Sequence, residues 1–378
     1  MEVSLKKICL ILFGVSYFIF LSFSLLGHIP ILGGYLDALT NVGLVILLFS
    51  ILLQIKTYSK KEIIVISSLF VFSFILIYSC NDYGLFKLVL FITSLKNVKL
   101  EKCISIDLYI RSFLVILVLL LYLLNIAPDV TSYFNGTTRH SLGFTNPNNL
   151  GMHVLILSFD ILCLNNYKIS IKKYLIIVLL LAFSDYFTGS RSTTYILLLA
   201  LILIILYKRY PNILTKKSTS FLIKNSALIF SGITFIMYMF YNYGTDIGIK
   251  LNELLSNRLH NIDVYNQVYD ITLFGNDNLN IGLTLDTAYA YCLYVYGIAM
   301  FILFVFAFKR LFKKLYKTKK YMFVIIMFCF MVYGLSERLW LYVDYNIYMI
   351  LFSLILYNTN NVSLSCEKEV VSYEKDNK

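Results

Sequence analysis

Three arginines, Arg139, Arg191 and Arg258, stand apart from the many lysines of this chain by residue type and by position. An arginine guanidinium is a rigid fork that binds phosphate through two parallel hydrogen bonds, whereas lysine acts as a point charge. Arginines held near a membrane surface predict an anionic ligand, and lipid-linked sugars carry a phosphate or pyrophosphate at that depth. Binding a pyrophosphate leaving group would stabilise the charge that develops as its bond to a sugar breaks.

Other site chemistries leave no signature in the sequence. There is no Walker loop, no H-E-x-x-H pair and no cluster of carboxylates spaced for a metal ion, so we expect neither a metal nor a cofactor. The seven cysteines form no C-x-x-C pair, and we interpret them as packing residues.

The elements that position the arginines are expected to lie in a membrane. The chain of 378 residues is 59% apolar and 14% charged, with a mean hydropathy of +0.76. Soluble globular domains are about 45–50% apolar and about 25% charged, so a water-soluble enzyme is excluded. A net charge of +12 could indicate nucleic acid, but the positive-inside bias of membrane proteins accounts for it and no nucleic-acid partner is expected.

Apolar runs that could cross a bilayer recur along the whole chain. A hydrocarbon core of about 30 Å needs roughly 20 helical residues. The predicted spans lie near 8–27, 37–55, 63–80, 84–95, 104–126, 147–164, 174–188, 193–207, 225–242, 284–308, 321–336 and 339–357. The expected fold class is therefore an all-α polytopic integral membrane protein with about 12 transmembrane helices.

These spans predict the domain organisation. We expect a single transmembrane domain over 1–357, with outer loops at 127–146 and 243–283, followed by a polar cytoplasmic tail over 358–378. Of the 33 lysines and arginines, 26 fall in alternate loops, which marks those loops as cytoplasmic and places both termini there. Of the cations in these cytoplasmic loops 24 are lysine, whereas four of the five in the opposite loops are arginine.

Three pairs of predicted helices are too short for two full crossings. Residues 174–207 reach at most about 51 Å as helix, against about 60 Å for two crossings, and 63–95 and 321–357 also fall short. Charged tips at that depth are tolerated beside protein or water, which favours an outward-open cavity lined by both signs of charge. Local thinning of the bilayer with snorkelling side chains is the alternative.

The second outer loop contains a candidate surface helix over 247–270. An apolar stripe would run from Leu251 to Tyr269 at spacings of three and four, with Arg258 inside it. Arg258 would then face the cavity mouth or the lipid headgroups, and the alternative is an interfacial arginine that snorkels.

Two motifs surround the first two arginines. Residues 139–151 read R-H-S-L-G-F-T-N-P-N-N-L-G, and residues 188–192 read T-G-S-R-S. They resemble the R-x-S-x-G-F-x-N-P-N-x-x-G signature and the T-G-S-R-S/T turn of Wzy-type polysaccharide repeat-unit polymerases. Asn257-Arg258, Leu273-Phe274-Gly275 and residues 285–297 follow the order of that family, so the resemblance covers roughly residues 60–357.

The resemblance implies a GT-C-like glycosyltransferase in the bacterial cytoplasmic membrane. Such enzymes join oligosaccharide units carried on undecaprenyl pyrophosphate into capsule, O-antigen or exopolysaccharide, at the extracytoplasmic face and without a metal. The partners it implies are the lipid-linked oligosaccharide, membrane lipid, a flippase and a chain-length regulator protein. Arg139, Arg191 and Arg258 would contact the pyrophosphate.

The same resemblance suggests roles for residues around the arginines. Gly143, Pro147 and Asn148 would shape the loop that presents Arg139, and Gly189 would shape the second turn, although Pro147 also fits an ordinary helix start. The candidate bases for the acceptor hydroxyl are His140, Asp286 and Glu337. His140 could equally be a solvated loop residue, and Glu337 could form an ion pair with Arg338.

Two other functions remain open at this point. A flippase for lipid-linked oligosaccharides would also have about twelve helices and a cationic cavity, but it is expected to show two related halves, and no repeat is visible. An O-antigen-ligase-like transferase would carry His-Asn ahead of a spaced glycine. Here His260-Asn261 is present, but residue 271 is isoleucine and the glycine follows at 275.

Overall fold

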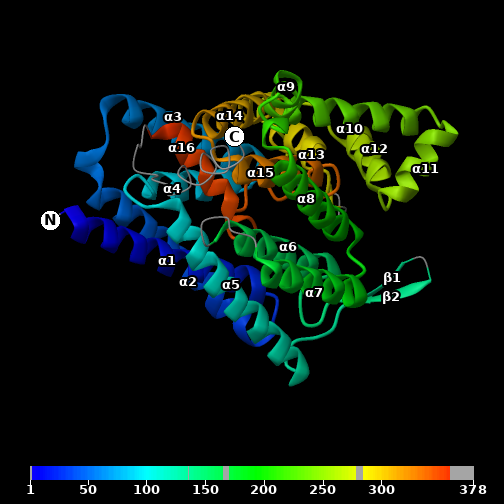
Figure 1. Ribbon diagram of the computed structural model, residues 1–378, viewed down its shortest axis with the longest axis horizontal. Helices are drawn as coiled ribbons and strands as arrows, with labels where there is room; N and C mark the ends of the chain where they lie inside the picture. The colour runs from blue at the N-terminus through cyan, green and yellow to red at the C-terminus, as the bar shows by residue number, and fades with distance from the viewer. Residues whose placement is uncertain (1, 135, 165–169, 278–283, 358–378) are drawn as a thin grey trace, which may run out of the picture. The chain divides into compact units, whose positions relative to one another are not determined.

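The chain is almost entirely helical and folds as two compact units. A computed structural model describes residues 2–134, 136–164, 170–277 and 284–357 (Figure 1). Unit 1 comprises Met1–Thr57, Leu90–Leu197 and Tyr357–Lys378, and unit 2 comprises Tyr58–Val89 and Leu198–Leu356. The single transmembrane domain expected over 1–357 stays a prediction, and the tail expected over 358–378 lies outside the described residues.

Unit 1 is a set of packed apolar helices. Helix α1 packs against α2 and α5, α5 packs against α6, and α6 packs against α7. The helical elements are α1 (Glu2–Leu26), α2 (Pro30–Leu53), the short 3-10 helix η1 (Ile55–Thr57), α5 (Leu100–Leu123), α6 (Pro147–Cys163) and α7 (Ile171–Thr188). Helix α6 is buried along nearly its whole length, because neighbours cover several of its faces.

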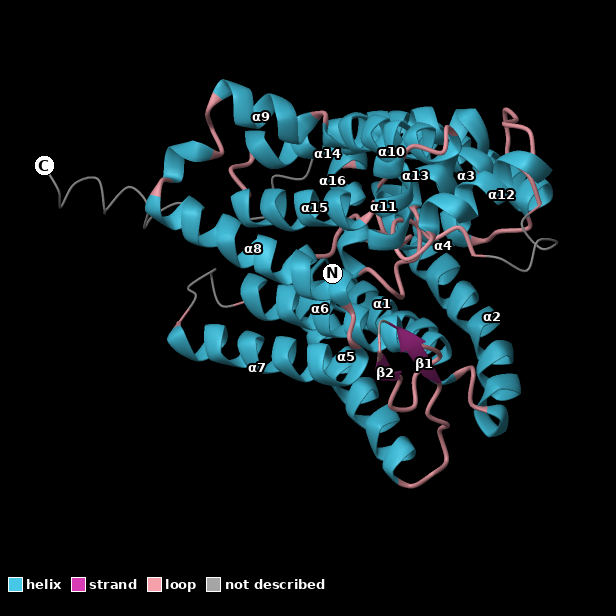
Figure 2. Ribbon diagram, turned by 90° about the vertical axis from the view of Figure 1, so that its right-hand side faces the viewer, coloured by secondary structure: helices cyan, strands magenta, loops and turns pink. Residues whose placement is uncertain are grey.

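A two-stranded antiparallel hairpin interrupts the helices of unit 1. It consists of β1 (Thr131–Phe134) and β2 (Thr137–His140), and it is the only sheet among the described residues (Figure 2). Ser132 lies opposite Arg139 and Thr131 lies opposite His140. Strand β2 contacts α7, so the hairpin holds the arginine and the histidine beside the end of that helix.

Unit 2 is centred on the apolar helix α15 (Tyr321–Tyr333), which is buried along most of its length. Helix α10 packs against α11, α12, α13, α14 and α15, and α14 packs against α15 and α16. The other elements are α3 (Lys60–Cys80), η2 (Pro211–Ile213), α9 (Lys217–Lys224), α10 (Ser226–Asn242), α11 (Asp246–Leu254), α12 (Arg258–Val268), α13 (Ala288–Tyr294), α14 (Gly297–Lys317), η3 (Ile347–Phe352) and α16 (Ser353–Leu356). Helices α4 (Gly84–Ser94) and α8 (Arg191–Arg209) contribute residues to both units.

Several of these helices can cross a membrane. Five in the described part of the chain are long and apolar enough, at Leu5–Leu26, Leu32–Leu53, Lys60–Cys80, Leu100–Leu123 and Arg191–Arg209. Helices α9 and α10 make a sixth if the pair, bent by 66°, counts as one span. The protein is therefore a helical polytopic membrane protein, whereas twelve spans and cytoplasmic termini stay predictions.

Three of the predicted helices are not continuous. The helix expected over 247–270 breaks into α11 and α12, because Ser256 and Asn257 adopt left-handed backbone conformations. The span expected over 284–308 breaks between α13 and α14, where Gly297 adopts a left-handed conformation with φ of +81°. The span expected over 339–357 is irregular up to Asn346 and continues as η3 and α16.

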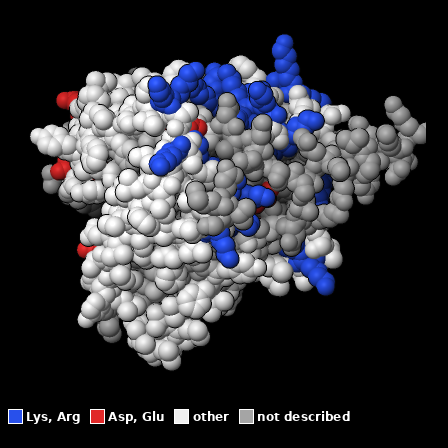
Figure 3. Space-filling view, turned by 90° about the vertical axis from the view of Figure 1, so that its left-hand side faces the viewer, with Lys and Arg blue, Asp and Glu red and all other residues white. Residues whose placement is uncertain are grey.

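Basic side chains gather at one end of unit 2. Helix α9 packs against α14, and the ammonium of Lys224 lies 4.8 Å from the ring centre of Tyr316 near the C-terminus of α14. Lys314 and Lys317 occupy the last turn of α14. Figure 3 shows lysine and arginine side chains crowded on the face that it presents, with few acidic ones. This end has the charge expected of a cytoplasmic surface.

Candidate functional site

Arg139 connects the hairpin to the ends of two helices in unit 1. Its Nε donates to the carbonyl oxygen of Thr188 at 2.6 Å, and its Nη2 donates to Oδ1 of Asn148 in the first turn of α6. The strand, the end of α7 and the start of α6 therefore all fix the direction of this guanidinium. A lysine could not make both contacts, because its ammonium lacks the planar fork.

Arg191 begins α8 directly after the same turn. Gly189 ends α7 in a left-handed conformation with φ of +52°, and the backbone amide of Arg191 donates to the Gly189 carbonyl at 3.0 Å. A methyl group added at Gly189 would lie 3.4 Å from both Cγ and Nε of Arg139. The Arg139 side chain thus lies against the turn from which Arg191, 52 positions later in the sequence, begins a helix. The positive end of that helix dipole adds to the field of the arginines.

The residues predicted to shape the first loop have distinct local roles. Gly143 has a φ of +90°, and a Cβ there would lie 2.9 Å from Cβ of Tyr122. Pro147 occupies the first turn of α6, after Asn146, whose side chain caps the helix by accepting from the Asn149 amide at 2.9 Å. Pro147 therefore fits the ordinary helix start that was its alternative interpretation. Asn148 contacts Arg139 directly.

Gly151 allows α6 to approach the second motif. A Cβ at Gly151 would lie 2.7 Å from both Cβ and Oγ of Ser190 and 2.9 Å from Oγ1 of Thr193. Those distances are shorter than van der Waals contact, so the two motifs pack against each other through the last glycine of the first. Gly151 is part of the sequence motif, but the sequence does not show that it packs against Ser190.

His140 is held by a carboxylate that the sequence analysis missed. Its Nδ1 lies 2.6 Å from Oδ2 of Asp129, while Oδ1 of Asp129 accepts from the backbone amides of Ser141 and Leu142. Burial alone would raise the pKa of the Asp129 carboxyl, but the hydrogen bonds from His140, Leu142 and Ser141 outweigh it and lower the pKa below its ordinary value. The His140 side chain remains 41% exposed. A carboxylate on Nδ1 leaves Nε2 able to accept a proton, as a general base requires.

The other predicted residues meet in unit 2. Nη2 of Arg258, at the start of α12, donates to Oε1 of Glu337 at 2.7 Å, and Nε of Arg258 lies 4.0 Å from Oδ2 of Asp286. The Arg258 and Glu337 side chains are only 10% and 16% exposed. Glu337 therefore pairs with Arg258, which is 79 residues away, in place of the neighbouring Arg338 considered from the sequence. A carboxylate bound in this way is a poor candidate for a base.

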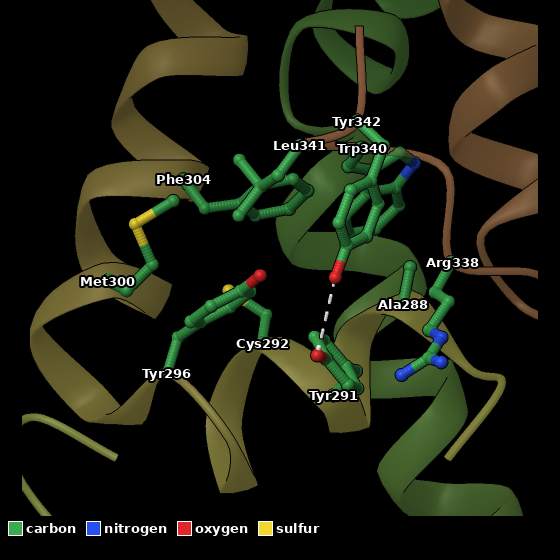
Figure 4. Close-up of a pocket in the computed structure, with 10 residues that line it drawn as sticks. All are labelled: Ala288, Tyr291, Cys292, Tyr296, Met300, Phe304, Arg338, Trp340, Leu341 and Tyr342. Carbon is green, nitrogen blue, oxygen red and sulfur yellow. Dashed lines mark hydrogen bonds between the residues drawn. The ribbon is translucent and has the colours of Figure 1, made fainter. Parts of the chain in front are cut away.

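Arg338 lines an aromatic pocket in the same unit. Its guanidinium carbon lies 4.6 Å from the ring centre of Tyr291, a cation–π arrangement. The pocket is small and is also lined by Tyr296, Trp340 and Tyr342, among others. Figure 4 shows the hydroxyls of the three tyrosines turned toward its centre, with Arg338 beside Tyr291.

The predicted site residues thus fall into two groups. Arg139, Arg191 and His140 lie in unit 1 with Gly143, Pro147, Asn148 and Gly189, and Arg258, Asp286 and Glu337 lie in unit 2. Asp129, which binds His140, and Arg338, which contacts Tyr291, belong to no motif recognised in the sequence. The sequence offered only weak indications of these two residues. Asp129 lies in the same predicted outer loop as His140, and Arg338 is one of the few arginines outside the lysine-rich loops.

No group of three or more His, Cys, Asp or Glu side chains is placed to hold a metal ion in the part of the chain that the structure describes. Comparison of the chain with protein-family models, with curated proteins and with solved structures finds no significant match.

Proposed function

We propose that the chain is an extracytoplasmic glycosyltransferase that joins oligosaccharide units carried on a lipid pyrophosphate, as a polysaccharide polymerase does. The observation that carries the proposal is the placement of the Arg139 side chain against the Gly189 turn, directly before the helix that Arg191 begins. Two guanidiniums and a helix N-terminus suit a ligand with two linked phosphates. In this proposal the chain has about twelve spans in a bacterial cytoplasmic membrane, with both termini in the cytoplasm.

The reaction needs a clamp for the leaving group and an acceptor for one proton. The acceptor hydroxyl oxygen bonds to the anomeric carbon of the donor sugar. The anomeric carbon–oxygen bond to the pyrophosphate breaks, and its electron pair stays on the phosphate oxygen, where the arginines stabilise the charge. His140, oriented by Asp129, takes the hydroxyl proton on Nε2. Because neighbouring residues on a strand project to opposite faces, substrate must extend around the hairpin edge to reach both Arg139 and His140.

The test replaces each arginine by lysine in a strain that lacks the chromosomal copy. Arg139→Lys and Arg191→Lys keep the charge but lose the bidentate grip, so we expect long surface polysaccharide to fall by about ten- to a hundredfold. Arg209→Lys, at an exposed position near the end of α8, is the matched control. Chain length is measured on gels of surface polysaccharide, and protein level by immunoblot. Normal chain length in both arginine variants would contradict the proposal.

A lipid-linked oligosaccharide flippase is the second candidate, and one buried cluster favours it. In unit 1 the guanidinium of Arg111 contacts Asp107, Tyr17 and His153, and all four residues are fully buried. Charged groups inside membrane-spanning helices are typical of transport pathways. The location of single repeat units in a deletion strain separates the two functions. Units that accumulate outside support the polymerase, and units retained in the cytoplasmic leaflet support the flippase.

A further inference from the structure

We propose that Arg338 and Tyr296 form a second oxyanion subsite, in the aromatic pocket of unit 2, which binds a phosphate or carboxylate group of the substrate. The reaction proposed above binds its pyrophosphate in unit 1, so it does not account for an anion site in unit 2. That the anion belongs to a lipid-linked sugar rests on the proposed function, whereas the existence of the subsite rests on the geometry described next.

Among the described residues Arg338 has no hydrogen-bond acceptor, and the carboxylate of Asp286 acts on it only through its charge. Within the part of the chain that the structure describes, its guanidinium makes the stacking contact with Tyr291 and no hydrogen bond or ion pair. Two carboxylates of unit 2 are engaged elsewhere, since Glu337 binds Arg258, and Asp82 accepts from the hydroxyls of Tyr291 and Tyr342. The stacked ring holds the guanidinium in place while its N–H groups remain available.

Tyr296 adds an unsatisfied polar atom to the same pocket. The residue is 2% exposed, and its hydroxyl lies near that of Tyr342 but makes no hydrogen bond of normal geometry among the described residues. A buried hydroxyl without a partner destabilises the fold, so its presence favours an occupant that bonds to it. A phosphate or carboxylate group in the pocket would satisfy both groups by accepting from Tyr296 through one oxygen and from Arg338 through another.

The aromatic lining restricts what else could bind. The Trp340 ring is stacked on Phe304 at 4.1 Å between centres, forms a T-shaped pair with Tyr289 at 4.5 Å, and is only 5% exposed. Stacking of a sugar ring on this indole is therefore blocked. The pocket is small, so it suits a single anionic group and leaves the rest of a sugar outside.

Trp340 provides a direct assay, because it is the only tryptophan in the chain and it lines this pocket. The full chain, purified in detergent, is titrated with inorganic pyrophosphate, with glucuronate and with glucose, while tryptophan emission is excited selectively. We expect saturable changes with pyrophosphate, with glucuronate or with both, and none with glucose. A response to pyrophosphate alone identifies the lipid carrier as the source, and a response to glucuronate alone identifies an acidic sugar.

Two variants connect the response to the proposed residues. Arg338→Met should weaken binding by about ten- to a hundredfold, the loss expected for hydrogen bonds to a charged group, whereas Arg310→Met, at an exposed position on α14, should leave it unchanged. Tyr296→Phe should weaken binding by about fivefold or more and leave the free protein equally or more stable to heat, because an unsatisfied hydroxyl has been removed.

Either of two results overturns the subsite. One is an equal response to glucose and glucuronate, and the other is a response that Arg338→Met does not change although the variant melts at the wild-type temperature. Because the readout is binding, it is independent of polymer synthesis. A chain that binds pyrophosphate here but makes no polymer would retain the subsite and lose the proposed function.

Discussion

The ion pair between Arg258 and Glu337 allows a test that separates a structural carboxylate from a catalytic base. Glu337→Gln keeps the shape of the side chain and removes its charge, which leaves Arg258 largely buried with its Nε unbonded. The remaining carboxylate is Asp286, whose Oδ2 lies 4.0 Å from that Nε. We expect the variant to lose stability in unit 2, because a buried cation has lost its closest partner.

The size of the loss follows from the two distances. At an effective dielectric constant of about 20, unit charges 2.7 Å apart attract by about 6 kcal/mol, and charges 4.0 Å apart by about 4 kcal/mol. Breaking a buried pair commonly costs about 3–5 kcal/mol when nothing replaces it. Because Asp286 retains part of the attraction, we expect a cost of about 2 kcal/mol, or a decrease in Tm of about 4–8 °C for a unit of this size.

The assay is a double-mutant cycle on the purified full chain in detergent. Thermal unfolding is measured for wild type, Glu337→Gln, Arg258→Met and the double variant. Because the double variant contains neither buried charge, it should recover most of the lost Tm, which gives a coupling energy of about 1–2 kcal/mol. Polysaccharide chain length is measured for the same four proteins in the deletion strain.

Stability and activity together decide the role of Glu337. If Glu337 only positions Arg258, the loss of polymer in Glu337→Gln should follow its loss of stability. If Glu337 is the base, the double variant stays inactive at restored stability, and so does Glu337→Gln at temperatures where it is fully folded. An unchanged Tm in Glu337→Gln would refute the reasoning, because it would mean that the buried cation does not need this carboxylate.

Two further outcomes follow from packing and from pKa. Gly151→Ala should destabilise unit 1 by about 1–3 kcal/mol, because its Cβ would overlap Ser190, and adding Ser190→Gly should restore part of the lost stability. Gly232→Ala in α10 is the control, because open space surrounds that glycine, and it should be neutral or stabilising by up to about 1 kcal/mol. Thermal unfolding measures the stability of all three. The folded-state pKa of Asp129 is below its unfolded value, so its carboxylate stabilises the fold above about pH 4 and the contribution fades as the pH falls through the folded pKa. The difference in Tm between wild type and Asp129→Asn should therefore be constant at neutral pH and shrink in acid, and a difference that grew in acid would contradict this sign.

Local features of the site could be read from the sequence because they depend on a few neighbouring residues. The helix start at Pro147 with its Asn146 cap and the left-handed glycines at 143 and 189 follow from backbone preferences within one turn. The membrane class also follows from the sequence, because the length of an apolar run is a local quantity.

The partners of the charged side chains could not be read in this way. His140 and Asp129 meet through a hairpin, Arg139 reaches the turn before Arg191 because β2 packs against α7, and Arg258 reaches a carboxylate 79 residues away. The break between α11 and α12 could not be predicted either. Its left-handed residues, Ser256 and Asn257, are not glycines, and of the expected apolar stripe only the part on α12 is buried.

The sequence by itself therefore determined a helical membrane protein, the arginines that mark its candidate anion site, and the turns that present two of them. The tertiary structure decided which cations are neutralised, since Arg258 is paired with Glu337 whereas Arg338 lines a pocket and has no hydrogen-bond acceptor among the residues that the structure describes. The physical reason is that the interactions of a charged side chain depend on the groups within a few ångströms of it. Chain packing brings those groups together from distant positions, which the spacing of residues in the sequence does not predict.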